Sequence, residues 1–145
     1  MENWNKILTK TEAAYLAGFI DGEGCIHIKR RSKTNAPALV LSVSNTNKLV
    51  ILWLCKLFNH TFHKRRLKNG TKDAYVFVVT GKKAGYILEQ LLPYFKIKKD
   101  RAKLAIKFSK RIKGTGYKLT NKEVEIRLKF RSKIQELNRV SENRR

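Results

Sequence analysis

The sequence predicts an α+β domain in which two antiparallel hairpins alternate with helices, and three observations support this prediction. Apolar residues recur at three- and four-residue steps in several segments, which is typical of helices. Two pairs of shorter runs alternate apolar and polar residues, as strands do, and turn residues separate the members of each pair. The predicted order is therefore αββαββα, followed by further helices at the C-terminus. With 145 residues, 42% of them hydrophobic, we expect one domain over residues 1–145, with a core at about 10–112 and a C-terminal helical extension at about 113–145.

The first helix and hairpin come from the N-terminal part of the chain. Thr11 precedes EAAYLAGFID and is expected to cap a helix that ends at Gly22 or Gly24. CIHIKRR and ALVLSVSN then alternate, and SKTNAP joins them into a hairpin. The segment NKLVILWLCKLFN is too long and too continuously apolar for a half-exposed strand, so we expect a buried helix at about 47–58.

The second hairpin and the remaining helices follow. TFHKRRLK and DAYVFVVT are predicted strands with Asn69 and Gly70 in their turn. A helix is expected over 82–92, closed by Pro93, and another over about 100–112, ended by KGTGYK. The last helix is expected at about 121–137, with a frayed tail SENRR. KKAGYILEQ is similar to the first helix but lacks its acidic end, so one carboxylate-tipped helix is predicted.

The charge predicts a polyanionic partner. The chain has 33 Lys and Arg against 11 Asp and Glu, a net charge of +22, and phosphates of a nucleic acid compensate such a field. Cys25 and Cys55 lack a disulfide framework and zinc-ligand spacing, which favours a reducing compartment. No apolar run reaches the ~18 residues that cross a bilayer, and the N-terminus has no signal or transit pattern. We expect a soluble chain with no membrane partner, in an organelle (mitochondrion or chloroplast) or a microbial cytoplasm.

The segment YLAGFIDGEG leads small and apolar residues straight into two carboxylates, Asp21 and Glu23. On a helix, Ala14, Gly18 and Gly22 share one face that has almost no side chain, so another backbone can approach closely. If the partner is the same helix of a second subunit, a two-fold axis brings both Glu23 side chains together, and paired carboxylates suit Mg²⁺ and phosphoryl transfer. The alternative is a strip that packs on the protein's own sheet, with solvated carboxylates at the helix end.

LAGFIDGEG, residues 16–24, resembles the signature of the LAGLIDADG homing endonucleases. The predicted αββαββα order also matches that family. LLPYFKIKKDRAKL, residues 91–104, is similar to a Pro-Phe-x-Lys-x-Lys segment of its single-motif, homodimeric members, and the resemblance covers roughly residues 10–112. It implies a saddle of antiparallel strands in the DNA major groove, signature helices at a dimer axis and metal ions at their ends.

The resemblance implies roles for the two acids of the signature. Glu23 stands at the position of the family's metal-binding acid, usually Asp, and the carbonyl of Gly22 is an expected additional ligand of Mg²⁺. Asp21 matches the earlier acid, which stabilises the helix end rather than binding metal.

The resemblance also implies three further catalytic residues. Lys98 matches the lysine near the scissile phosphate, although one more phosphate-facing lysine is the alternative. Asn45 sits where the family often has a Gln or Asn that positions solvent. Lys48 is the candidate for the accompanying basic residue, in a loose alignment.

The alternation of the strands predicts a DNA-binding face. If Ile26 and Ile28 face the core, the residues between them point away from it and can meet base edges and phosphates. The small groups of the second strand suit thymine methyls or bridging water, and a merely solvated basic face is the alternative. The predicted DNA-binding residues are His27, Lys29, Arg31, Lys33, Val40, Ser42, Ser44, His63, Arg65, Lys68 and Lys113.

These features predict a site-specific homing endonuclease. We expect a homodimer that makes a Mg²⁺-dependent double-strand break in a long pseudo-palindromic site in double-stranded DNA. Two alternatives remain open: a protein of the same fold that binds intron RNA and helps it splice without cleavage, and a basic structural RNA-binding protein. The first has no need of a metal-binding carboxylate, and the second leaves YLAGFIDGEG unexplained.

Overall fold

The computed structural model of this chain describes residues 6–30, 32, 36–68, 70, 72–113 and 118–143, and of 141–143 only the backbone. Two predicted DNA-binding residues, Arg31 and Lys33, lie outside the described residues, as do Asn69 of the second turn and residues 114–117 of KGTGYK.

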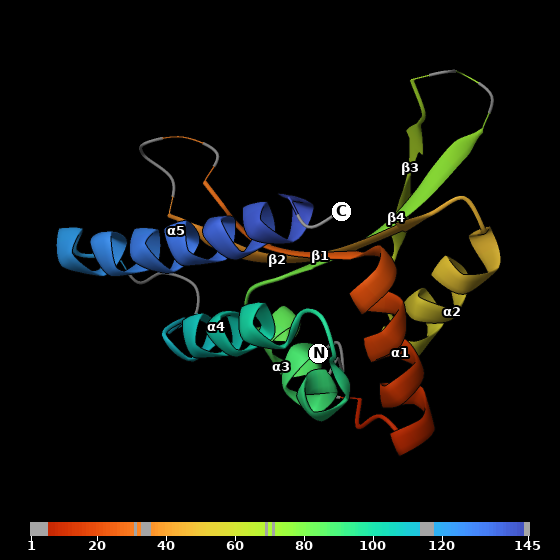
Figure 1. The fold of residues 1–145 in the computed structure, drawn as a ribbon, viewed down its shortest axis with the longest axis horizontal. Helices are drawn as coiled ribbons and strands as arrows, with labels where there is room; N and C mark the ends of the chain where they lie inside the picture. Colours follow the sequence, from red (N-terminus) through yellow and green to blue (C-terminus); the bar gives the residue numbers. More distant parts are fainter. Residues whose placement is uncertain are drawn as a thin grey trace.

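An antiparallel sheet of four strands forms the centre of the described structure (Figure 1). The strands lie in the order β1-β2-β4-β3, so the two hairpins join through their second strands. Their bounds are β1 (Gly24–Lys29), β2 (Ala38–Asn45), β3 (Phe62–Arg66) and β4 (Asp73–Thr80). The αββαββα order and the α+β class are confirmed.

Four helices cover one face of this sheet, below it in the view of Figure 1, and a fifth lies alongside β1. A short 3₁₀ turn, η1, contains Pro93 and follows the third helix. None of the described helices combines the length and apolar character needed to cross a membrane. The bounds are α1 (Lys10–Glu23), α2 (Lys48–Phe58), α3 (Gly81–Leu91), η1 (Leu92–Tyr94), α4 (Lys99–Lys110) and α5 (Asn121–Asn143).

The core lies between the sheet and the helices. In the register of β1 on β2, Ile26 is opposite Leu41, and both are buried with Phe77 of β4 on the helix side. The predicted inward residues Ile26 and Ile28 are therefore confirmed. Large side chains from the helices complete the cluster, among them Leu16, Ile20, Leu54, Phe58, Ile87 and Phe108.

The start of α1 corrects the predicted cap. Thr9, not Thr11, is the N-cap: its Oγ1 accepts a hydrogen bond from the Glu12 N–H at 3.1 Å, and the Glu12 carboxylate accepts from the Thr9 N–H at 3.2 Å. This reciprocal capping box needs Glu or Gln three residues after the cap. Thr9 has Glu12 at that position, whereas Thr11 has Ala14, which offers no acceptor.

The C-terminal helix α5 is longer than predicted, because it continues past Leu137 to Asn143. Ile134 is fully buried in the common core, and the ring of Phe130 lies edge-on to Phe108 of α4 at 5.9 Å. The Asn138 amide donates to the carbonyl of Ile26 at 3.3 Å. The bond from Asn138 lies past the predicted end of the helix, and it places α5 along the outer edge of β1, which would otherwise expose unpaired backbone groups.

Candidate active site and DNA-binding face

Glycine is required where α1 passes into β1. The N–H of Gly24 donates to the carbonyl of Ile20, and its extended backbone, with φ of −87°, begins the strand. A Cβ atom at Gly24 would lie 2.7 Å from Cγ2 and 2.9 Å from the carbonyl oxygen of Ile20, closer than real Cβ contacts. Because helix and strand follow without a loop, Glu23 stands at their junction, and it is exposed together with Gly22.

The strip of small residues on α1 faces away from the protein's own sheet. Ala14, Gly18 and Gly22 are all exposed. A Cβ atom at Gly18 or Gly22 would meet no atom of the described residues within 4 Å. The alternative that this strip packs on the chain's own sheet is therefore wrong. The face of α1 that does pack there consists of Ala13, Leu16, Ala17 and Ile20.

Asp21 is buried and joins the end of α1 to the segment before α4. Its Oδ2 accepts hydrogen bonds from the backbone N–H groups of Lys96 at 2.8 Å and Ile97 at 3.2 Å, and its Oδ1 accepts from that of Lys98 at 2.9 Å. Hydrogen bonds to a carboxylate are stronger than neutral ones. Asp21 therefore anchors the backbone beside the helix end, in accord with the structural role that the resemblance implies.

Lys98 is also buried, and its ammonium group caps the same helix end. Its Nζ donates to the carbonyl oxygens of Ile20 at 2.9 Å and Asp21 at 2.6 Å. These are carbonyls of the last turn of α1, where a cation is favoured by the helix dipole. In this structure Lys98 thus supports the backbone that carries Glu23.

We expect Asp21→Asn to lower the free energy of unfolding by about 3 kcal/mol, because an amide removes the charge and turns an NH₂ group toward backbone donors. Urea denaturation measures this difference. Asp100→Asn is the matched control, since Asp100 is an exposed carboxylate in α4, and we expect it to cost less than about 1 kcal/mol. Equal effects of the two substitutions would contradict the anchoring role of Asp21.

Asn45 and Lys48 lie at the turn between β2 and α2. The Oδ1 of Asn45 accepts from the N–H of Asn47 at 2.7 Å. Val43 pairs with Gly24, so the end of β2 that carries Asn45 lies at the same end of the sheet as Glu23. The Lys48 ammonium lies over the rings of Phe62 at 5.7 Å and Tyr75 at 5.6 Å. Lys48 is therefore directed toward β3 and β4 in this structure.

The strand registers place the described residues of the strands that were predicted to bind DNA on one face of the sheet. His27 pairs with Val40 and Lys29 with Ala38, while His63 pairs with Val76 and Arg65 with Ala74. Lys68 and Lys113 are exposed outside the strands. Val40 was predicted to contact DNA, but its side chain is only 7% exposed. The residues of this face are Cys25, His27, Lys29, Ala38, Val40, Ser42, Ser44, His63, Arg65, Ala74, Val76, Val78 and Thr80.

Two features of this face go beyond the residues that were predicted to bind DNA. Cys25 lies next to His27, with its Sγ 3.5 Å from Nδ1, and Val76 and Val78 lie on the outer side of β4. The alternation in DAYVFVVT, in which Tyr75, Phe77 and Val79 share one face of the strand, could have placed Val76 and Val78 on the other. Burial lowers the pKa of His27 and the neighbouring Lys29 lowers it further, so the ring is neutral at neutral pH.

His60 is part of the fold rather than a surface or groove residue. It is half-buried, its Nε2 forms a hydrogen bond with the carbonyl of Val78 at 2.6 Å, and its ring lies edge-on to Phe77 at 5.3 Å. The Lys83 ammonium lies 3.4 Å from Nδ1 and donates to the carbonyl of Phe58 at 3.1 Å. These bonds tie α2 and α3 to the end of β4.

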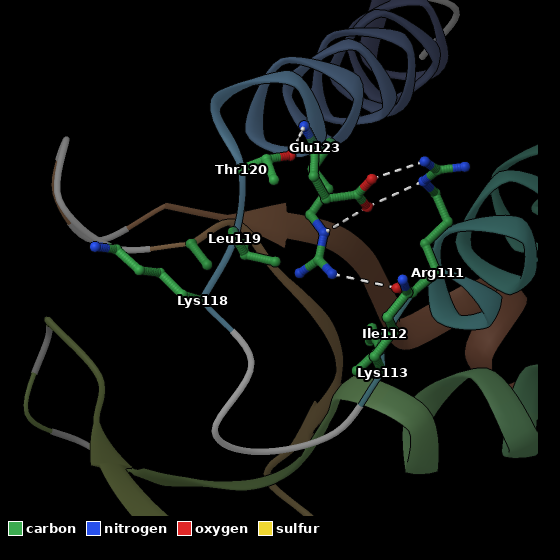
Figure 2. Close-up of a pocket in the computed structure, with 9 residues that line it drawn as sticks. Arg111, Ile112, Lys113, Lys118, Leu119, Thr120 and Glu123 are labelled. Carbon is green, nitrogen blue, oxygen red and sulfur yellow. Dashed lines mark hydrogen bonds and ion pairs between the residues drawn. The ribbon is translucent and has the colours of Figure 1, made fainter.

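The predicted DNA-binding residue Lys113 lines a basic pocket of about 310 Å³ between α4 and α5 (Figure 2). There Arg111 donates two hydrogen bonds to the Glu123 carboxylate, at 3.1 and 2.7 Å, and the buried Arg127 donates a third at 3.2 Å. The hydrogen bond from Arg111, reinforced by Arg127, lowers the pKa of Glu123. The ionised carboxylate thus links α4 to the first turn of α5, beside the exposed Lys113 and Lys118.

The helix end offers oxygen ligands for a metal ion. The Glu23 carboxylate and the Gly22 carbonyl are the hard donors that Mg²⁺ prefers. Among the described residues, no group of three or more His, Cys, Asp and Glu side chains could hold a metal ion.

The fold and this helix end define the class of protein: an αββαββα domain whose signature helix ends in an exposed carboxylate beside a basic, strand-built face. Residues 16–113 match the family described as LAGLIDADG endonuclease. The chain belongs to this family, and the resemblance seen in the sequence is confirmed.

Known proteins agree with this assignment. The DNA endonuclease I-CvuI of Chlorella vulgaris is 31% identical over 110 residues, 70% of this chain and 66% of the relative, so the match covers just under two thirds of that relative's length. The structure of I-CvuI in complex with the I-CreI target, in the presence of 2 mM Mg and with DNA not cleaved, is similar with a TM-score of 0.71 and 26% identity over 88% of this chain and 82% of that one. The LAGLIDADG homing endonuclease I-GzeII, solved in complex with its DNA target, shares the fold, with a TM-score of 0.63 and 18% identity over 82% of this chain and 43% of that one.

Proposed function

We propose that this protein is a site-specific homing endonuclease that acts as a homodimer and makes a Mg²⁺-dependent double-strand break in a long pseudo-palindromic DNA site. The observation that carries this proposal is the exposed Glu23 at the end of an exposed strip of small residues. Two copies of α1 that cross on this strip would bring both Glu23 side chains to the two-fold axis. Such a pair of carboxylates would complete the metal ligands that one chain lacks.

The basic face supports DNA as the substrate. Lys29, Arg65 and Lys68 are exposed on or beside the face of the sheet opposite the core. Structures of I-CvuI, the 31% identical relative, contain that protein in complex with DNA targets. In this chain, the charge of +22 would supply phosphate contacts along a long site.

The residues around the helix end would have different roles in cleavage. Glu23 and the Gly22 carbonyl would hold Mg²⁺, which supplies a polarised phosphoryl oxygen and an activated water. Lys98, through the carbonyls of Ile20 and Asp21, would keep the helix end in place and offset part of its negative charge. Asn45, whose side chain is fixed by Asn47, would orient water, and Lys48 would add positive charge near the phosphates.

A plasmid assay tests this function. A selection from randomised DNA first identifies the preferred site, which is then placed in a plasmid and incubated with the protein and Mg²⁺. We expect both strands to be cut at that site, and EDTA to prevent cutting. If the protein binds structured intron RNA and leaves the selected DNA intact in Mg²⁺, it is the splicing factor of the same fold instead.

The groove-facing and flanking cations should differ in their effects on binding. Lys29→Ala should change the base preference, because a lysine that reads a guanine contributes about 1 to 3 kcal/mol of discrimination. Lys113→Ala should weaken all sequences alike and reduce the slope of log K against log salt by about 0.9 for each phosphate that the variant no longer neutralises. Selections and salt titrations on both variants measure this. If Lys29→Ala selects the same target sequence as the parental protein while Lys113→Ala selects a different one, the roles assigned to these two lysines are reversed.

A further inference from the structure

The two central strands carry no charge on the DNA-binding face. The edge strands supply Lys29, His27, His63 and Arg65. The outward residues of the central strands are small and either apolar or hydroxylic: Ala38, Val40, Ser42 and Ser44 of β2 and Ala74, Val76, Val78 and Thr80 of β4. The middle of this face can therefore recognise a base pair only through apolar contacts, hydroxyl groups or bridging water.

Burial distinguishes Val78 from the other apolar side chains in the middle of these two strands. Ala74, Val40 and Val76 are only 3%, 7% and 7% exposed, and they are absent from the core cluster on the helix side, so neighbours on their own face cover them. Val78 keeps more of its surface accessible, and so does Ala38 at the end of β2. Among the described elements, α5 packs against α4 and β1 rather than against β2 or β4.

The surroundings of Val78 leave room for a base edge. Val78 pairs with Ser42, and Ser42 pairs with Cys25, so these three small side chains form one row across the sheet. Ser42 is half-buried and Cys25 is exposed. A row without long side chains lets the edge of a base approach the sheet closely.

The backbone at Val78 is also held in place. β3 pairs with β4 only as far as Phe77, so the carbonyl of Val78 has no partner from β3. His60 supplies one, through the hydrogen bond of 2.6 Å from its Nε2. Because valine has few χ1 choices, a fixed backbone also fixes its two methyl groups. The accessible apolar surface is thus preorganised.

Thymine presents an apolar group, its C5-methyl, in the major groove. We propose that Val78, in the row formed with Ser42 and Cys25, is a specificity-determining residue that contacts the C5-methyl of a thymine in each half-site. This inference rests on the proposed function. It commits the protein to a pyrimidine with a C5-methyl at that position, so 5-methylcytosine should be accepted in preference to cytosine.

Single-atom changes in the DNA test this contact. In the selected site, each thymine is replaced in turn by deoxyuridine, which removes only the methyl group, and affinity is measured by titration. Burial of one methyl corresponds to about a fourfold change in affinity. We expect one thymine in each half-site to show a loss of about threefold to fivefold with the parental protein. Cytosine at the same position should bind more weakly than 5-methylcytosine.

A variant then assigns the methyl contact to Val78. With Val78→Ala, the affinities for thymine and deoxyuridine at that position should become equal. Val140→Ala is the matched control, because Val140 is an exposed valine of α5, and it should keep the full discrimination. The inference is overturned if no thymine responds to deoxyuridine, or if Val78→Ala discriminates as the parent does. A parental protein that prefers no DNA sequence at all would instead reject the proposed function.

Discussion

Glu23→Gln should bind the DNA target about as tightly as the parental protein but cut it at least about a thousandfold more slowly, since the amide keeps the shape and loses the charge that holds Mg²⁺. Glu23 is exposed at the end of α1, so the substitution leaves no buried group unpaired. The loss should therefore fall on cleavage rather than on folding.

Cleavage and binding of Glu23→Gln are measured on the same plasmid-derived fragment, with Mg²⁺ for cutting and Ca²⁺ for binding. Glu136→Gln serves as the control, because Glu136 is an exposed glutamate of α5, and it should cut at the parental rate. If Glu23→Gln cuts at the parental rate in Mg²⁺, the assignment of the metal site to the end of α1 is wrong.

Gly18→Leu should convert the protein into a folded monomer with no double-strand cleavage. A leucine side chain at this position would hold two α1 helices apart, because close backbone approach requires small residues at the crossing. In the single chain, a Cβ atom at Gly18 meets no atom of the described residues within 4 Å. Leucine is also the better helix former, by about 0.8 kcal/mol. The substitution should therefore leave the single chain folded, although the stabilisation that dimerisation gives by mass action is lost.

Sedimentation and thermal unfolding together test Gly18→Leu. A monomer that still unfolds cooperatively supports the small-residue interface, and a dimer with parental activity contradicts it. Ser132→Leu is the control, since it adds the same side chain to an exposed position of α5, and it should leave the dimer intact.

Strand and helix types could be predicted because their signals are local. The alternation in ALVLSVSN and DAYVFVVT placed β2 at 38–45 and β4 at 73–80, as the structure has them. The capping error at Thr11 was avoidable, because Glu12 stands three residues after Thr9. The end of α5 could not be predicted from local sequence, since the hydrogen bond from Asn138 to the carbonyl of Ile26 spans 112 positions of the chain.

For the candidate site, the sequence by itself determined that one helix of small residues ends in carboxylates within a strongly basic chain. Four-residue spacing and charge are properties of the chain itself, but they left open whether the strip packs on the chain's own sheet, and the role of Glu23 as a metal-binding acid came from the resemblance of LAGFIDGEG to the family signature. The faces that the strand residues occupy follow from the period of two. The order of the strands in the sheet and the pairing of β2 with β4 do not follow from this period.

Only the tertiary structure decided where the polar groups of the signature point. Asp21 binds the backbone of Lys96, Ile97 and Lys98, and the Lys98 ammonium binds the carbonyls of Ile20 and Asp21, across 75 to 78 positions of the chain. Hydrogen bonds act only over about 3 Å and in narrow directions. A local pattern can supply the groups, but the packing of α1 against the segment before α4 selects their partners.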